Sequence, residues 1–187
     1  MQTDQELVKA AQNGDVNAFG ELYERYVDKI YRYCLLRLSR KHEAEDMAED
    51  VFLRALQSLG SFQWKGAPLS SWLFRIAHNL VIDERRKGSN KESVPIEDAP
   101  QVDNHTVDVE EMVELRLTFQ ETYSAMRFLT SAQQQVIALR FGGELSIAEV
   151  AKIMGKKEGA IKALQHSAVA ALRRNLSRTT SVPRELR

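Results

Sequence analysis

The chain is poor in the features that mark secreted and membrane proteins. Its 187 residues include one cysteine, Cys34, so no internal disulfide can form, which is typical of a reducing cytoplasm. No apolar run approaches the roughly 18 residues of a membrane-spanning helix, and the polar, acidic N-terminus is unlike a signal peptide. With an apolar content of 43%, these absences favour a soluble cytoplasmic protein with a packed core.

Patterns of catalytic and metal-binding residues are also missing. The four histidines and the single cysteine show no metal-ligand spacing, and no glycine-rich phosphate loop occurs. Cys34 falls on an apolar helical face, which favours a buried core thiol over a redox sensor. We therefore expect neither an enzyme nor a bound cofactor or metal.

A net charge of zero hides a strong segregation of charge along the chain. Residues 1–87 carry 13 basic and 13 acidic side chains, whereas residues 88–123 carry 2 basic and 9 acidic ones. Residues 124–187 carry 11 basic and 4 acidic side chains, as expected of a module that faces phosphates. The acidic middle stretch fits a solvated linker and a functional segment equally well.

Helical signals occupy almost the whole chain, with no strand pattern and no internal repeat. The spacing predicts one short helix after Asp4 and a longer one capped by Asp15, followed by helices at 43–59 and 70–87. Helices resume at about 108–128 and again from Thr130. Gly88, Pro95 and Pro100 interrupt the pattern. We predict an all-α fold with domains at 1–87 and 124–178, joined by a flexible acidic linker at 88–123, and a disordered tail at 179–187.

The clearest motif is a helix-turn-helix at 145–174. Ser146 and Glu149 form a capping box, and Gly155 is suited to the left-handed residue that ends the first helix. The first helix has an apolar face of Ile147, Val150, Ala151 and Met154, and the second one of Ile161, Leu164, Ala168 and Leu172. This motif indicates DNA binding.

A second region combines aromatic, basic and amide side chains in a way that suits single-stranded nucleic acid. Bases stack on aromatic rings while cations follow the phosphates. We interpret Trp64 as functional and Trp72 as part of the core. The candidate residues are Phe62, Trp64, Lys65, Arg75, His78, Asn79, Arg85, Arg86 and Lys87.

Taken in order, these segments resemble a bacterial sigma-70 family factor of the extracytoplasmic-function group. Residues 45–55 resemble the family's polymerase-binding helix, residues 72–83 its second promoter-reading helix, and residues 129–176 its C-terminal domain. The N-terminal domain would then be a sigma2-like helical bundle and the C-terminal one a sigma4-like helix-turn-helix domain. The resemblance covers nearly the full chain.

The resemblance implies roles for named residues and partners. Asp46, Glu49, Asp50 and Arg54 would bind the β and β′ subunits of core RNA polymerase. The loop from Ser61 to Lys65, with Asn79 nearby, would capture a base flipped from the melted −10 element. The acidic linker would follow the path of the RNA in the polymerase. An anti-sigma factor is the expected inhibitor. The second helix of the C-terminal motif would read the −35 duplex through Lys156, Lys157, Glu158, Lys162, Gln165 and His166.

The chain departs from the family pattern in its recognition helix. Cations usual in the family are replaced by Leu164 and Ser167, which leaves the −35 base preference open and shifts the base-reading chemistry toward Gln165. Two other functions remain as alternatives: a stand-alone helix-turn-helix regulator, and a helical protein-interaction adaptor with a degenerate DNA module.

Overall fold

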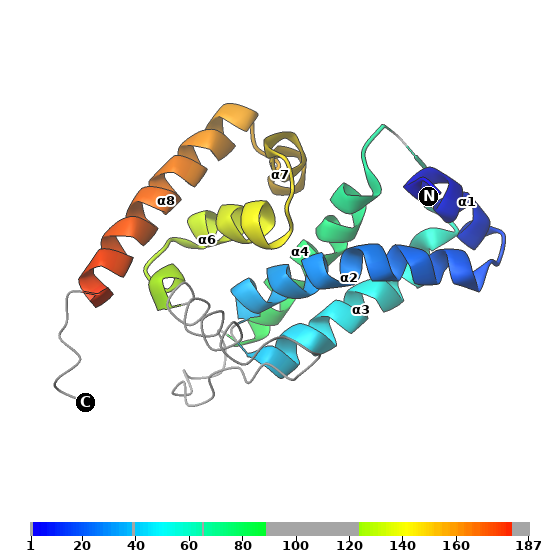
Figure 1. The fold of residues 1–187 in the computed structure, drawn as a ribbon, viewed down its shortest axis with the longest axis horizontal. Coiled ribbons are helices and arrows are strands. Elements are labelled where there is room, and N and C mark those ends of the chain that lie inside the picture. Colours follow the sequence, from blue (N-terminus) through cyan, green and yellow to red (C-terminus); the bar gives the residue numbers. More distant parts are fainter. Residues whose placement is uncertain (1, 39, 65, 89–123, 181–187) are drawn as a thin grey trace.

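The computed structural model describes residues 2–38, 40–64, 66–88 and 124–180, and every regular element among them is a helix (Figure 1). The linker, the predicted helix over most of 108–128 and residues 181–187 lie outside this part. The helices are α1 (Asp4–Gln12), α2 (Val16–Leu38), α3 (Lys41–Leu59), α4 (Leu69–Gly88), α6 (Ser131–Ile137), the π-helix η1 (Ala138–Gly142), α7 (Ile147–Met154) and α8 (Glu158–Thr180).

Two predicted helix starts are wrong by one or two residues. The N-cap of α1 is Thr3, whose side chain forms a capping box with Glu6, rather than Asp4. Helix α3 begins at Lys41, two residues before the predicted start, after an extended Arg40 with no side-chain cap. Helix α8 spans Glu158–Thr180. Asp15 caps α2 as predicted, since its carboxylate accepts the amide hydrogens of Asn17 and Ala18 at 2.9 and 3.2 Å.

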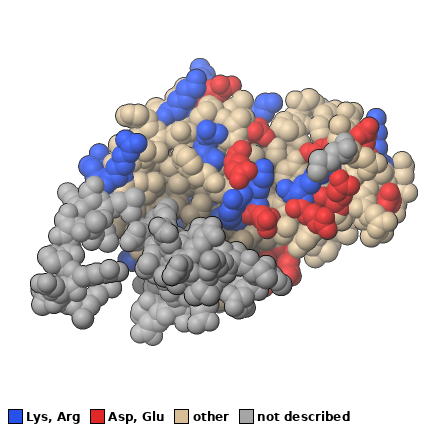
Figure 2. Space-filling view, in the orientation of Figure 1, with Lys and Arg blue, Asp and Glu red and all other residues tan. Residues whose placement is uncertain are grey.

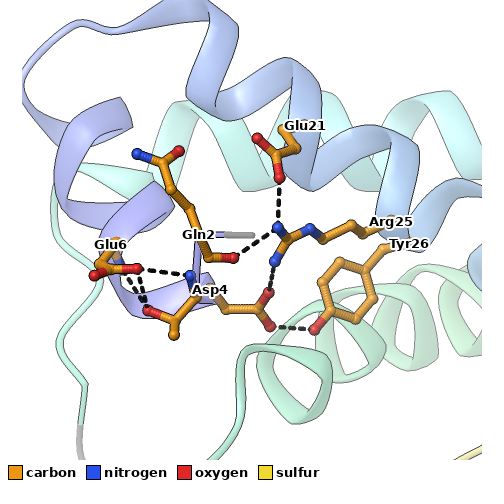
Figure 3. Close-up of polar contacts among 7 residues, drawn as sticks. Gln2, Asp4, Glu6, Glu21, Arg25 and Tyr26 are labelled. Carbon is orange, nitrogen blue, oxygen red and sulfur yellow. Dashed lines mark hydrogen bonds and ion pairs between the residues drawn. The ribbon is translucent and has the colours of Figure 1, made fainter.

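A polar cluster ties the first helix to the second (Figure 3). Arg25 of α2 donates to the carboxylate of Asp4 at 2.9 Å and to the backbone carbonyl of Gln2 at 2.7 Å. It also pairs with Glu21, and the Tyr26 hydroxyl donates to Asp4. Burial and the Asp4 carboxylate raise the pKa of Tyr26, so this hydroxyl stays a donor at physiological pH.

The N-terminal bundle forms around α2, which packs against α1, α3 and α4. Its core includes Ile30, Tyr33 and Cys34 from α2, all fully buried. Burial raises the pKa of the Cys34 thiol to about 12, so the thiol is protonated and inert. Cys34 is therefore a core residue, as predicted.

The C-terminal half contains the predicted helix-turn-helix. Ser146 and Glu149 form the capping box of α7, and Gly155 ends this helix in the left-handed conformation with φ 61°. Helix α7 buries Val150 and Ala151 as expected and also Ile153, which lies off the predicted stripe. The additional burial is explained by a second partner, because α7 packs against α4 as well as α8.

Replacing Gly155 with alanine is expected to lower the free energy of unfolding by about 1 kcal/mol, because a Cβ disfavours the left-handed region. No atom lies within 4 Å of the position that this Cβ would occupy, so the cost is backbone strain and not a clash. Gly60→Ala is the matched control, since Gly60 caps α3 with φ −58° and also has open space around its Cβ position. Urea denaturation of both variants measures the difference; equal losses would contradict the argument.

The two halves pack against each other and share one apolar core (Figure 1). Helix η1 lies on α2, and α7 lies on α4, so buried residues of both halves form a single cluster. A second, smaller cluster of Met126, Leu129, Ile137 and Ala168 lies in the C-terminal half, and Leu36 of α2 packs against it. The sequence predicts two domains joined by a flexible acidic linker, and in the structure the described parts of these domains are in direct contact.

Candidate interfaces for polymerase and promoter DNA

The acidic residues predicted to bind polymerase form one exposed stripe on α3. Asp46, Glu49 and Asp50 are all exposed, whereas Met47, Val51 and Ala55 on the opposite side of the helix are buried. The structure thus leaves these carboxylates on a solvent-facing surface, where they can contact a basic partner.

Two leucines missed in the sequence analysis extend this stripe. Leu53 and Leu56 expose 53% and 52% of their surface, which is unusual for such large apolar side chains on a helix. Leu53 lies three residues after Asp50, and so on the same helical face. Both leucines fall outside the helical positions that form the buried stripe of α3, and this spacing in the sequence could have indicated that they are exposed. The α3 face therefore combines charge with exposed apolar surface, as protein interfaces do.

The loop between α3 and α4 has an aromatic cluster at its centre. The half-buried Phe62 ring lies 4.7 Å from the Trp72 ring and 6.0 Å from the Trp64 ring, measured between centroids. Trp64 stands at the outer edge of this cluster with 38% of its surface exposed. Trp72 is half-buried and packs against the core, as predicted, but it also reaches the surface beside the loop. An exposed ring on an aromatic support is a platform on which a base can stack.

A cavity of about 500 Å³ opens next to this cluster. The side chain of Gln12 in α1 holds its rim in place, because its Nε2 donates to the carbonyls of Leu59 and Phe62 at 2.9 and 2.8 Å. The Ser61 hydroxyl donates to the carbonyl of Ser58 at 2.9 Å. The cavity is lined by Ser58, Ser61, Phe62, Gln63, Ala67, Pro68, Ser71, Trp72, Arg75 and Lys152.

The structure brings together only part of the predicted −10 set. Arg75 lines the main cavity, while Asn79 lies in a neighbouring groove with Arg54, the residue predicted to bind polymerase. His78 and Arg85 instead face the C-terminal half: Gln135 lies 2.8 Å from His78 Nδ1, and Arg85 donates to Gln134 Oε1 at 3.4 Å. Arg86 is exposed at the end of α4, and Lys65 lies outside the described residues.

The environment of His78 predicts a loss of stability in acid. Burial lowers the pKa of His78, and the positive charge of Arg37 lowers it further. The folded protein therefore binds fewer protons at this site than the unfolded chain, whose histidine has a pKa of about 6.5. We expect stability to fall as the pH drops below about 6.5, and the thermal melting temperature of His78→Gln to fall less than that of the wild type over the same range. Identical pH dependence would exclude this contribution.

The predicted −35 residues lie at and beyond the turn of the helix-turn-helix. Lys156, Lys157 and Glu158 are exposed at the start of α8, and Lys162 and His166 follow on its exposed side. Figure 2 shows lysine and arginine side chains along the α8 end of the molecule, in line with the basic C-terminal third of the sequence. Lys156 and Lys157 before α8, together with Lys162 in its second turn, thus provide a basic surface suited to the phosphates that flank a major groove.

Gln165 faces inward more than the other members of this set. It is half-buried, and its Oε1 accepts a hydrogen bond from Nε of Arg140 at 2.9 Å. Adenine is read by a glutamine that uses its carbonyl oxygen and its amide nitrogen together. In this conformation Arg140 occupies one lone pair of that oxygen, so a bidentate contact with adenine would have to share the oxygen with Arg140.

The two positions that lack the family's cations have structural partners. Leu164 is half-buried against the main core, and the Ser167 hydroxyl accepts a hydrogen bond from Nε2 of Gln133 at 3.0 Å. Both side chains therefore fasten α8 to the rest of the C-terminal half.

Within the described ranges, no helix is both long and apolar enough to cross a membrane, and no cluster of three or more His, Cys, Asp or Glu side chains is placed to hold a metal ion.

Each half of the chain matches the model of a known protein family. Residues 22–91 match the model for Sigma-70 region 2, and residues 125–174 match that for Sigma-70, region 4. The first match contains α3, the aromatic loop and α4, and the second contains the helix-turn-helix.

Individual relatives belong to the same family as the two matching models. The chain is 41% identical over 173 residues to the ECF RNA polymerase sigma factor BldN of Streptomyces coelicolor, covering 91% of this chain and 65% of BldN. It is 32% identical to the ECF factor SigW of Bacillus subtilis, covering 90% of this chain and 94% of SigW.

Solved structures share the fold. The structure of CnrH with the cytosolic domain of CnrY superposes with a TM-score of 0.71 at 23% identity, covering 93% of this chain and 97% of that one. The factor RpoE of Bartonella quintana, solved with the anti-sigma factor NepR, gives a TM-score of 0.68 at 23% identity, covering 87% of this chain and 98% of that one. The chain belongs to the sigma-70 family, in its extracytoplasmic-function group.

Proposed function

We propose that this chain is a promoter-specificity subunit, which binds core RNA polymerase, directs it to promoters and helps to open them. The observation that carries the proposal is the cavity lined by Phe62, Trp72 and Arg75, together with the exposed Trp64 ring that packs against Phe62. It lies within the part of the chain that matches Sigma-70 region 2. The polymerase supplies the catalysis, and this chain supplies recognition.

The α3 stripe is the proposed polymerase contact. Asp46, Glu49 and Asp50 supply negative charge for a basic surface on the β and β′ subunits, and the exposed Leu53 and Leu56 supply apolar area. Charge complementarity sets the encounter rate and orientation, whereas buried apolar area holds the complex together.

The aromatic loop is the proposed site for a base flipped from the −10 element. A base leaving the stack loses stacking energy, which an aromatic platform restores, and a cation next to the cavity balances the neighbouring phosphate. Trp64 and Phe62 provide the rings, and Arg75 provides the cation. Asn79 in the adjoining groove is placed to meet the next nucleotide.

Helix α8 is the proposed −35 reader. Lys156 and Lys157 are exposed just before α8 and Lys162 is exposed in its second turn, where all three suit phosphate contacts. Glu158 and His166 are the exposed candidates for base edges. Because Arg140 donates a hydrogen bond to Gln165, we propose a smaller role in base reading for this glutamine than the sequence suggested.

An anti-sigma factor is the proposed inhibitor, and the cytoplasm, where polymerase works, is the proposed location. The CnrH and RpoE structures were solved with the cytosolic domain of CnrY and with NepR, respectively. We expect a partner of the same kind to cover the α3 stripe, because binding there would exclude polymerase. The acidic segment 88–123 keeps its predicted role along the RNA path.

Run-off transcription with core polymerase, this protein and a promoter library tests the proposal. We expect specific transcripts that depend on the protein and share a −35 and a −10 sequence. Absence of specific initiation with every library member, when a control sigma factor works, would contradict it. Tight duplex binding without polymerase would favour the stand-alone regulator instead.

A further inference from the structure

We propose that Ser71 of α4 contacts the edge of the flipped −10 base, through a hydroxyl that has no partner until a base enters. The inference rests on the proposed function, because Ser71 lines the −10 cavity, the one that Phe62, Trp72 and Arg75 also line. Serine is common at the start of helices, so the sequence pattern did not indicate this role. A hydrogen bond to the base edge fixes the orientation of the base, which stacking alone does not.

The Ser71 side chain is buried without a hydrogen bond. It lies in the first turn of α4, where its backbone amide donates to the carbonyl of Pro68 at 3.0 Å. Only 5% of its surface is exposed, and its Oγ finds no hydrogen-bond partner among the described residues. A hydroxyl in this state has lost its contact with water and gained no bond in return, so it destabilises the free protein.

Two other buried polar atoms lack a partner in the described part of the chain. They are the hydroxyl oxygen of Tyr33 and Nε of Arg37, both in α2. Neither of these residues lines the −10 cavity, whereas Ser71 does. Unpaired buried polar groups are rare in folded proteins and call for an explanation. At the wall of a binding cavity the explanation is a ligand that supplies the missing partner.

The other serines that line the −10 cavity are already engaged. The Ser58 hydroxyl donates to the carbonyl of Arg54 at 2.6 Å, and the Ser61 hydroxyl donates to the carbonyl of Ser58 at 2.9 Å. Each has given its single hydrogen to the backbone. Ser71 can still both donate and accept, so its hydroxyl can pair with either kind of polar atom on a base edge.

The position of Ser71 suits a contact with a stacked base. Ser71 and Arg75 are four residues apart on α4 and therefore lie on one face of the helix, and both line the −10 cavity. Phe62 and Trp72, whose ring centroids are 4.7 Å apart, supply the aromatic surface of the same cavity. A base that stacks on a ring leaves its edge free for hydrogen bonds. Ser71 thus supplies a neutral hydroxyl beside the cation that faces the phosphate.

Contact with the base requires only a small movement. In the free protein the Ser71 oxygen is covered from solvent, although the residue lines the cavity. Rotation about the Cα–Cβ bond moves this one heavy atom between three staggered positions and leaves the α4 backbone in place. Entry of a base therefore exchanges an unpaired hydroxyl for a paired one.

Thermal melting of the full chain tests whether the Ser71 hydroxyl is unpaired in the free protein. Ser71→Ala removes a hydroxyl without a bond, so its melting temperature should equal or exceed that of the wild type. Ser70→Ala is the matched control on the same turn, because the Ser70 hydroxyl donates to Glu149 at 2.5 Å and its loss should lower the melting temperature. A lower melting temperature in Ser71→Ala would reveal a structural bond and overturn the proposal.

Contact with the base is measured with holoenzyme, assembled from core polymerase and the full chain, on a fork-junction form of a promoter from the run-off library. Abasic sites placed in turn along the −10 element identify the flipped position, which then carries each of the four bases. For the wild type we expect the best base to bind more tightly than the abasic site. Ser71→Ala should lower this ratio of affinities about three- to tenfold, as expected for one hydrogen bond, and leave the affinity for abasic DNA unchanged.

The possible outcomes separate this inference from the proposed function. Ser70→Ala should keep the wild-type ratio, because Ser70 does not line the −10 cavity. A wild-type ratio in Ser71→Ala would overturn the role of Ser71 and leave the proposed function intact. An equal loss on abasic DNA and on DNA with the base would also overturn it, since the hydroxyl would then not act on the base. If the wild type itself bound abasic DNA as tightly as every base, the proposed −10 site would be wrong.

Discussion

Replacing Asp50 with arginine is expected to weaken binding to core RNA polymerase about tenfold or more. Asp50 is exposed in the middle of the α3 stripe, between Asp46 and the exposed Leu53. Reversing the charge at this position removes an attraction to a basic surface and adds a repulsion. A loss of about 1.4 kcal/mol in binding free energy raises the dissociation constant tenfold. Surface plasmon resonance with immobilised core polymerase measures the change.

Glu24→Arg is the control for this experiment, because Glu24 is exposed on α2 outside the stripe and its reversal changes net charge equally. We expect Glu24→Arg to bind within about twofold of the wild type, the size of effect expected of a rim charge. Unaltered affinity in Asp50→Arg would remove α3 from the interface. A similar loss in both variants would indicate a non-specific electrostatic effect.

Replacing Trp64 with alanine is expected to reduce open-complex formation far more than recruitment to duplex promoter DNA. A stacked base contributes about 1–3 kcal/mol, which corresponds to roughly 5- to 150-fold in the equilibrium for opening. Trp64 is exposed at the edge of the aromatic cluster, so its removal leaves the Phe62–Trp72 contact in place. Permanganate footprinting measures opening, and gel-shift assays of the closed complex measure recruitment.

Trp64→Phe should retain most of the opening activity, because a smaller ring can still stack. Val16→Ala is the control for loss of an exposed apolar side chain, since Val16 exposes 82% of its surface at the start of α2. It should leave both steps unchanged. Equal loss of opening and recruitment in Trp64→Ala would show that the tryptophan has a structural role.

Local signals predicted the helices well because caps and periodicity depend on near neighbours in the sequence. The capping box of Ser146, the left-handed Gly155 and the carboxylate cap of Asp15 are all found. The same signals could mislead when two candidates were adjacent, as with Thr3 and Asp4 at the start of α1. The exposed acids of α3 follow from the apolar stripe on its other face.

Features that depend on a distant partner were not predictable in this way. Ile153 is buried although it lies off the expected stripe, because α4 covers a second face of α7. Gly142 and Gly143 read as a turn, whereas Gly142 ends a π-helix and both pack against the N-terminal half. The sequence suggested Gln165 as a base contact, whereas in the structure its Oε1 accepts a hydrogen bond from Arg140 of η1.

The sequence by itself determined the all-helical fold, the helix-turn-helix and the separation of an acidic α3 face from a basic C-terminal third. Each of these features depends on residue spacing or composition over a short stretch of the chain. Tertiary structure alone decided that Lys152 completes the wall of the proposed −10 cavity and that Glu144 reaches Lys29 and Arg32. These residues are far apart in the sequence, and only packing of the two halves brings them together. Local patterns specify which face a helix buries, but the shape of the whole molecule selects what that face meets.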